Sequence, residues 1–203
     1  FLGLLNTYAS RINYYRAKFQ GLEQFQALLL ALTDVNYRVV YETYRDIAVT
    51  YGVYVSAGVN VAEARRVESA TEPALVNTLR DSDEPLRPYA YEAVSPEVHN
   101  TTMIFRPDGQ VLVPDGTGGV LAAPNETGGV LRGSINKSYL VPLELDLLSL
   151  AASPVRDLDV LDTPLGRLGV VISKDAWMVD VNERWDAKRA NLLIQSEAFS
   201  AWA

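Results

Sequence analysis

Ser173 is the residue of this chain whose surroundings are most typical of a nucleophile. It follows the apolar run Leu168–Ile172, which is itself preceded by a turn containing Pro164 and Gly166. The apolar run predicts a buried strand, and the polar residues that follow predict the start of a helix. At such a corner the side chain is lifted off the sheet, and the amides of the next turn face whatever charge develops there. The sequence therefore predicts a candidate active site at Ser173.

The stretch around Ser173 also carries a family resemblance. Residues 162–175 read D-T-P-L-G-R-L-G-V-V-I-S-K-D and resemble the signature of the nitrilase superfamily, the carbon-nitrogen hydrolases, whose catalytic cysteine occupies the serine position. This chain contains no cysteine. A serine hydroxyl needs a positioned base in order to react, and nothing in the spacing places the single histidine, His99, next to it. The resemblance therefore implies the family fold with an altered nucleophile.

A second stretch, residues 137–144 (K-S-Y-L-V-P-L-E), is similar to the segment of these enzymes that supplies a catalytic lysine and a second glutamate. The resemblance implies these roles for Lys137 and Glu144. An ammonium beside a nucleophile can stabilise a tetrahedral oxyanion, and a neighbouring carboxylate holds the ammonium in place. The candidate substrate-binding residues are Lys174, Asp175 and Trp177 next to the corner, and Glu197 after the predicted strand 191–195.

The elements that must position these side chains alternate between helical and strand patterns. Apolar residues recur at helical spacing over about 22–32 and 40–51, and residues 33–36 between them are good helix N-caps. The run 53–59 predicts a strand buried on both faces, and residues 99–113 predict a hairpin. This alternation indicates an α/β fold. The resemblance narrows it to a nitrilase-like four-layer α-β-β-α sandwich.

We expect one domain over residues 1–203, with a surface insertion at about 62–96. That stretch carries charges, four prolines and no sustained period, and it predicts one short helix over 73–79. The resemblance covers most of the chain. It implies that a general-base glutamate lies just before residue 1 and that the last strands of the domain follow residue 203, so we expect both domain ends to be missing.

Composition excludes several classes of function. The chain has 203 residues and a net charge of -7, which argues against binding to a phosphate backbone, so we expect no nucleic-acid partner. No apolar run approaches the roughly 18 residues of a membrane span. With no cysteine and one histidine, a zinc or iron site would depend on carboxylates alone. We therefore expect no metal and no cofactor.

Three functions remain open. The first is a nitrilase-like amide hydrolase that uses serine, or a cysteine-to-serine trap. The second is a pseudoenzyme whose pocket binds a small amide, nitrile or carboxylate without cleaving it. The third is a structural or assembly role built on the sandwich and its oligomer contacts. Lys137, Glu144 and Asp175 favour the first two, and the missing thiol favours the second. The resemblance also implies a homo-oligomer that pairs through residues 178–189. No feature of the sequence indicates a compartment.

Overall fold

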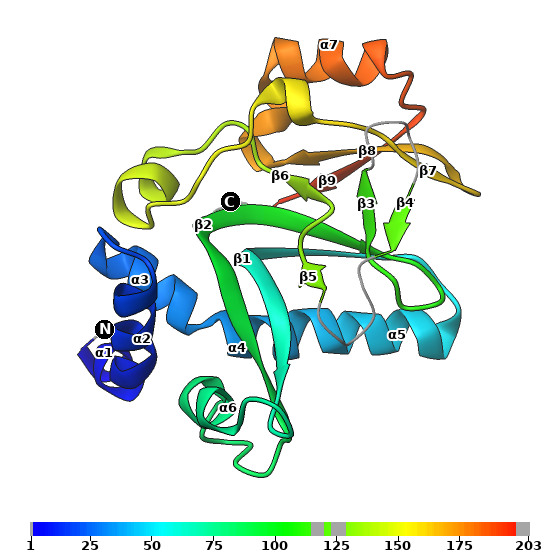
Figure 1. The fold of residues 1–203 in the computed structure, drawn as a ribbon. Helices are drawn as coiled ribbons and strands as arrows, with labels where there is room; N and C mark the ends of the chain where they lie inside the picture. The colour runs from blue at the N-terminus through cyan, green and yellow to red at the C-terminus, as the bar shows by residue number, and fades with distance from the viewer. Residues whose placement is uncertain (1, 115–119, 123–128, 198–203) are drawn as a thin grey trace.

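The fold is built around one long antiparallel pair of strands. In this computed structural model, which describes residues 2–114, 120–122 and 129–197, strand β1 (Val55–Glu68) pairs with β2 (Tyr89–Phe105) (Figure 1). Two short strands, β5 (Val130–Leu131) and β6 (Ile135–Asn136), pair with the outer edges of β1 and β2. The sheet order is β5-β1-β2-β6, and its pairings are antiparallel.

A second sheet of three strands carries the Ser173 corner. Strand β7 (Leu161–Thr163) is antiparallel to β8 (Gly166–Ile172), and β8 is parallel to β9 (Leu192–Ser196). The pair β3 (Leu112–Pro114) and β4 (Val120–Ala122) forms a separate ribbon after the predicted hairpin turn. The observed fold is therefore a mixed α/β fold, in which most strand pairings are antiparallel.

Helices lie on the outer sides of the two sheets. The helical run of α4 (Thr33–Asn36), the π-helix η1 (Tyr37–Glu42) and α5 (Thr43–Tyr51) lies below β1 and β2 in Figure 1. Strands β7 to β9 lie above that sheet, and α7 (Val179–Ala187) lies above them. The strands that carry the predicted site residues are therefore enclosed between helices.

Two apolar cores fill the spaces between these elements. Tyr37 and Phe105 belong to a core between the α4–α5 run and the first sheet, whereas Ile104 and Trp185 belong to a core around the second sheet. Ile104 and Phe105 are neighbours in β2, and successive side chains of a strand point to opposite faces. A single strand therefore contributes to both cores, which fixes the second sheet against the first.

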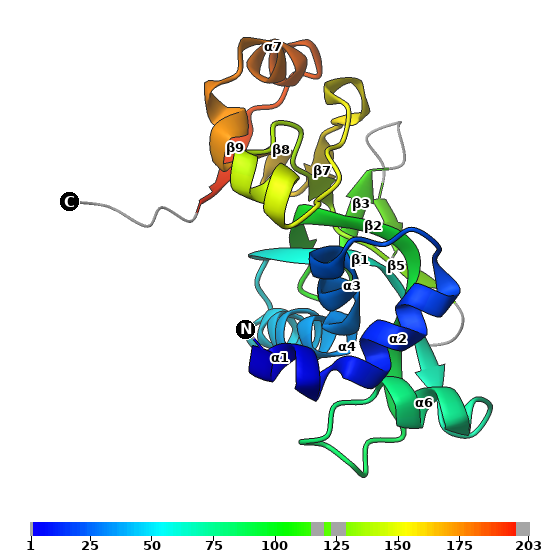
Figure 2. The same ribbon diagram turned by 90° about the vertical axis from the view of Figure 1, so that its left-hand side faces the viewer.

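The remaining helices pack beside the far end of β1 and β2, as Figure 2 shows. These remaining helices are α1 (Leu2–Thr7), α2 (Ala9–Lys18), α3 (Gln24–Ala31) and α6 (Pro73–Leu79). The short turns of helix elsewhere in the chain are η2 (Leu143–Leu147), η3 (Val155–Asp157) and η4 (Ser173–Trp177).

A membrane-spanning helix would have to be longer and more apolar than any that the structure describes.

The predicted break between two helices near residues 33–36 is displaced by one residue, because the break lies at Leu32, between α3 and α4. These residues are helical, and no side chain caps the turn. Asp34 is buried, and its carboxylate accepts hydrogen bonds from the amides of Tyr91 (2.9 Å) and Asp81 (3.1 Å). A residue typical of an N-cap is therefore used for tertiary contacts. The predicted end of this helix is confirmed at Gly52, which has the left-handed φ of 63°.

The predicted surface insertion at 62–96 is narrower in the structure than the sequence pattern indicates. Residues 62–68 continue β1 and residues 89–96 belong to β2, so only 69–88 leave the sheet. Ala64 and Glu92 are buried in this strand pair. The charged residues that obscured the strand pattern in the sequence include an ion pair between β1 and β2. In this pair, Arg65 Nε lies 2.5 Å from Glu92. The predicted helix over 73–79 is confirmed as α6.

Candidate functional site

The chain turns sharply from strand to helix at Ser173, as the sequence pattern predicts. Strand β8 ends at Ile172, and the 3₁₀ helix η4 begins at Ser173. Ser173 has a φ of 51°, in the left-handed region that residues other than glycine seldom adopt. Such a conformation costs about 1–3 kcal/mol and persists only where the surrounding structure imposes it. The strained corner presents the Ser173 side chain to a cavity.

Lys137 and Glu144 form a buried ion pair. The Lys137 Nζ atom lies 3.0 Å from Oε1 and 2.8 Å from Oε2 of Glu144, and the lysine side chain is 2% exposed. Lys137 directly follows β6, and its amide donates to the Asn100 carbonyl of β2. Glu144 lies in η2. The sheet edge and this helical turn therefore bring the two side chains together.

The Glu144 carboxylate is fully occupied by hydrogen bonds. Besides Lys137, the Asn100 Nδ2 atom donates to Oε1 (2.7 Å) and the Val141 amide donates to Oε2 (2.9 Å). Burial alone would raise the pKa of Glu144, but the hydrogen bonds from Lys137, Val141 and Asn100 outweigh it and lower the pKa. A carboxylate that accepts four hydrogen bonds and has a lowered pKa is a poor proton acceptor. Its chemical role is to hold the Lys137 ammonium.

One cavity of about 700 Å³ joins the predicted catalytic residues. Its walls come from β1, β2, the 137–144 loop, the Ser173 corner and the end of β9. Lys137, Glu144 and Ser173 all line it, although Ser173 is far from the other two in the sequence. A cavity of this size can enclose a small organic molecule.

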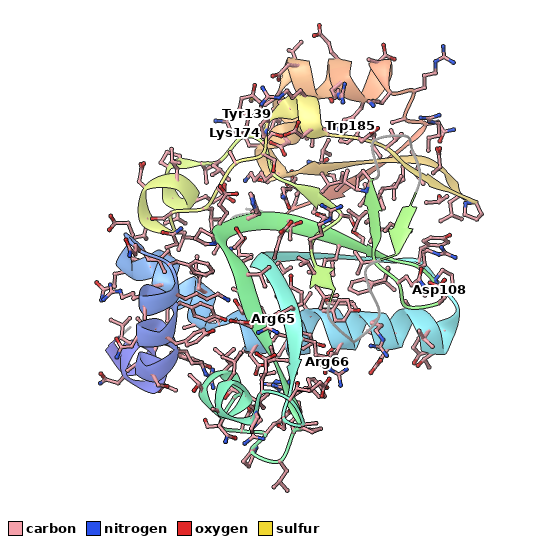
Figure 3. All side chains as sticks on the ribbon, in the orientation of Figure 1. Arg65, Arg66, Asp108, Tyr139, Lys174 and Trp185 are labelled. Atoms are coloured by element: carbon pink, nitrogen blue, oxygen red, sulfur yellow. The ribbon has the colours of Figure 1, made fainter. Side chains whose placement is uncertain are left out.

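The predicted substrate-binding residues divide into two groups. Glu197 lines the cavity and accepts a hydrogen bond from Gln195. Lys174, Asp175 and Trp177 are not among the described residues that line it. Trp177 is 68% exposed, and Lys174 lies in η4 (Figure 3). A 3₁₀ turn after a strand directs successive side chains apart, so the residues that follow the corner do not share its cavity.

Asp175 is buried and links the corner to the lysine loop. Its two oxygens accept hydrogen bonds from the amides of Ser138 (3.0 Å) and Tyr139 (2.8 Å). Burial raises the pKa of Asp175, and the amide hydrogen bonds only partly oppose this. The residue therefore fixes the position of the Lys137 loop against η4. The sequence predicts a ligand contact for Asp175, whereas in the structure both of its carboxylate oxygens are bonded to backbone amides.

His99 lies away from the Ser173 cavity. Its Nδ1 atom is 2.9 Å from the Ala151 carbonyl, and its ring lines a second, smaller cavity of about 190 Å³. Asn100 and His99 are neighbours in β2 and point to opposite faces, so only Asn100 reaches the larger cavity. The Ser173 hydroxyl is therefore without a histidine partner in the described part of the chain.

The sequence pattern did not predict several polar residues in and beside the cavity. Asn60 and Asn100 line it, and the Thr102 hydroxyl donates to Ser196 at 2.8 Å, which joins β2 to β9. Asn100 and Thr102 are two residues apart in β2, so their side chains lie on the same face of the strand. Two polar side chains at a spacing of two in a buried strand are the signal that could have identified them.

No metal site accompanies this cavity in residues 2–114, 120–122 and 129–197, where no group of three or more histidine, aspartate or glutamate side chains is placed to hold an ion.

Comparison with known proteins finds similarity among solved structures. No family model matches the sequence, and no curated protein matches it. Among solved structures the chain is similar to the crystal structure of a carbon-nitrogen hydrolase from Helicobacter pylori G27, with 14% identity and a TM-score of 0.49. The match covers 82% of this chain and 40% of that one. The chain thus spans less than half the length of that relative. Similarity at this level does not assign it to a family.

Proposed function

We propose that this chain is a carbon-nitrogen hydrolase-like domain, built as a four-layer α-β-β-α sandwich, whose cavity binds a small amide, nitrile or carboxylate with weak or no turnover. The observation that carries the proposal is the convergence of the buried Lys137–Glu144 pair and the strained Ser173 corner on one cavity. Perturbed ionisable groups and strained backbone both concentrate at functional sites. The alternative structural role does not account for their meeting in a space of this size.

The Lys137 ammonium can bind a ligand through the N–H group that Glu144 does not use. An ammonium has three N–H groups, and Glu144 accepts two of those of Lys137. The third is available for an oxygen or nitrogen of a ligand in the cavity. If the Ser173 hydroxyl attacked an amide carbon there, the new C–O bond would place negative charge on the former carbonyl oxygen, where this N–H would stabilise it.

Weak turnover is expected because no described residue is hydrogen-bonded to the Ser173 hydroxyl as its base. The attack requires a group that takes the hydroxyl proton, and the amine leaving group must then receive one. Glu144 is saturated by its donors, and the hydrogen bonds that Lys137, Asn100 and Thr102 make among the described residues do not include Ser173. The cavity can therefore bind and polarise a carbonyl better than it can cleave the adjacent bond.

The test is a pair of measurements on the same protein. Binding of butyramide, followed by ligand-observed NMR, is expected in the wild type and absent from a Lys137→Met/Glu144→Leu variant that remains folded. Ammonia release from a panel of amides and nitriles is expected to be near the background rate. Rapid ammonia release by the wild-type serine protein would contradict the pseudoenzyme part of the proposal, whereas retained binding in the double variant would contradict the site.

We also propose that the chain self-associates through residues 178–189. The observation that favours this is the exposure of two large apolar side chains, Trp177 (68%) at the end of η4 and Val179 (71%) at the start of α7. Exposed apolar groups that lie together are typical of interfaces. Analytical ultracentrifugation is expected to detect a dimer or larger oligomer, which a Val179→Glu substitution dissociates. A wild-type protein that stays monomeric at high concentration would contradict this.

A further inference from the structure

We infer that the Ser173 cavity selects neutral and cationic amides and discriminates against carboxylates. The inference rests on the proposed binding function and narrows its ligand class. The groups that line the cavity include one ammonium, Lys137, and two carboxylates, Glu144 and Glu197, and no arginine in the described part of the chain. The formal charge of this lining is therefore negative.

The single cation is already neutralised. Both oxygens of Glu144 lie within 3.0 Å of the Lys137 ammonium, so its charge is compensated before any ligand arrives. One N–H remains, which suits one acceptor atom such as an amide carbonyl oxygen. A carboxylate would bring a full negative charge to this donor and lose its hydration, and a charge buried without a partner is strongly disfavoured. The geometry thus favours one neutral acceptor over an anion.

Glu197 adds a preference for positive charge. It lines the cavity at the end of β9 and is exposed. Gln195 donates to it, but no ion pair joins it to a lysine or arginine among the residues that the structure describes. A ligand ammonium could approach this carboxylate without displacing another cation. Exposed ion pairs contribute about 0.2–1 kcal/mol, which corresponds to an affinity gain of about 1.4- to 5-fold.

The test compares three probes of similar length: butyramide, butyrate and 4-aminobutyramide. Dissociation constants are measured by titration in ligand-observed NMR at low and high salt. Butyramide is expected to bind at least about tenfold more tightly than butyrate, because desolvating an unpaired carboxylate costs more than 1.4 kcal/mol. The cationic amide is expected to bind about two- to fivefold more tightly than butyramide, with a gain that shrinks at high salt.

A matched pair of variants locates the charge effect. Glu197→Gln is expected to abolish the advantage of 4-aminobutyramide over butyramide. Glu183→Gln makes the same chemical change on the exposed face of α7, outside the cavity, and is expected to preserve that advantage. An equal loss in both variants would show that net charge alone sets the preference and would overturn this part of the inference.

The outcomes separate this inference from the proposed function. Binding of butyrate as tight as that of butyramide, and lost in the folded Lys137→Met/Glu144→Leu variant, would overturn the ligand preference and leave the binding site intact. Absence of binding by all three probes, or binding that the double variant retains, would instead overturn the proposed function itself.

Discussion

Two buried glutamates in this molecule, Glu144 and Glu92, each accept hydrogen bonds from several donors. Glu144 receives hydrogen bonds from Lys137, Asn100 and the Val141 amide, and Glu92 receives them from Tyr14, Lys18 and Arg65. Burial alone would raise both pKa values, and the donors lower them. Glu92 joins α2 to the strand pair, where Arg65 lies in Figure 3. Of the two, only Glu144 lines a cavity described here.

The two glutamates differ in how exposed their cationic partners are. Lys137 is 2% exposed and depends on Glu144 for charge compensation. Lys18 and Arg65 are 26% and 33% exposed, and Arg65 also pairs with Glu72 at 2.7 Å. A saturated, buried carboxylate is therefore not a functional signal by itself. The signal is a cation that is completely desolvated at the wall of a cavity, because such a group needs a partner and still has a donor to offer.

The largest predicted effect follows from that contrast. Glu144→Leu is expected to lower the free energy of unfolding by about 3–5 kcal/mol, because it leaves the Lys137 charge buried and unpaired. Glu92→Leu is expected to cost about 1–3 kcal/mol, because water and Glu72 can compensate its cations. Urea titrations of the two variants measure both values.

A double variant provides the control for this prediction. Lys137→Met/Glu144→Leu removes both charges, and replacing a buried ion pair by apolar groups is often neutral or stabilising. Its stability is expected to return to within about 1 kcal/mol of the wild type while ligand binding stays lost. A double variant as unstable as Glu144→Leu would mean that the pair is held by packing rather than by charge compensation.

The next largest effect concerns Asp175, which links the Ser173 corner to the Lys137 loop. Asp175→Asn places an amide NH₂ where one carboxylate oxygen accepts from Ser138 or Tyr139, so one backbone donor loses its acceptor. We expect a loss of about 1–3 kcal/mol in urea unfolding, together with weaker butyramide binding as the Lys137 loop shifts. Asp180→Asn, which changes a hydrogen bond of the Tyr139 hydroxyl on the surface, is the control and is expected to cost less. Equal costs would remove the positioning role of Asp175.

Acid titration measures a smaller effect of the two glutamates on stability. Their folded pKa values are lowered, so the unfolded chain takes up protons first as the pH falls. The stability that each contributes is complete above the unfolded pKa of about 4.3 and is lost as the pH falls through the lower folded pKa. Glu144→Gln and Glu92→Gln are each expected to flatten the fall in stability below about pH 4.3. A variant with the wild-type acid profile would rule out that glutamate as a source of acid sensitivity.

The smallest effect concerns backbone strain inside and outside the cavity. Ser173 and Ser149 have φ values of 51° and 52°. Glycine adopts this conformation without strain but loses more chain entropy on folding, so Ser173→Gly and Ser149→Gly are each expected to gain about 0.5–1 kcal/mol. Thermal or urea unfolding checks both, and only Ser173→Gly is expected to change ligand binding. If neither variant gained stability, the strain at the corner would not be real.

Local patterns predicted much of the fold because their causes are local. The apolar run before Ser173, the left-handed glycine that ends α5 and the proline that begins α6 each act within a few residues. The same reasoning did not predict the role of Asp34, because this residue bonds to amides about 50 residues away. It also failed at the end of the long hairpin, where Arg65 and Glu92 compensate each other across two strands.

The sequence by itself determined which chemical groups were available: one serine at a strand end, one lysine and glutamate in a short loop, and no thiol. Only the tertiary structure decided that Lys137, Glu144 and Ser173 line one cavity. It also decided that Asp175 holds the Lys137 loop and that Asn100 donates a hydrogen bond to Glu144. The physical reason is that hydrogen bonds and burial depend on distance in space. Strand pairing and sheet packing set that distance between residues that the chain keeps far apart.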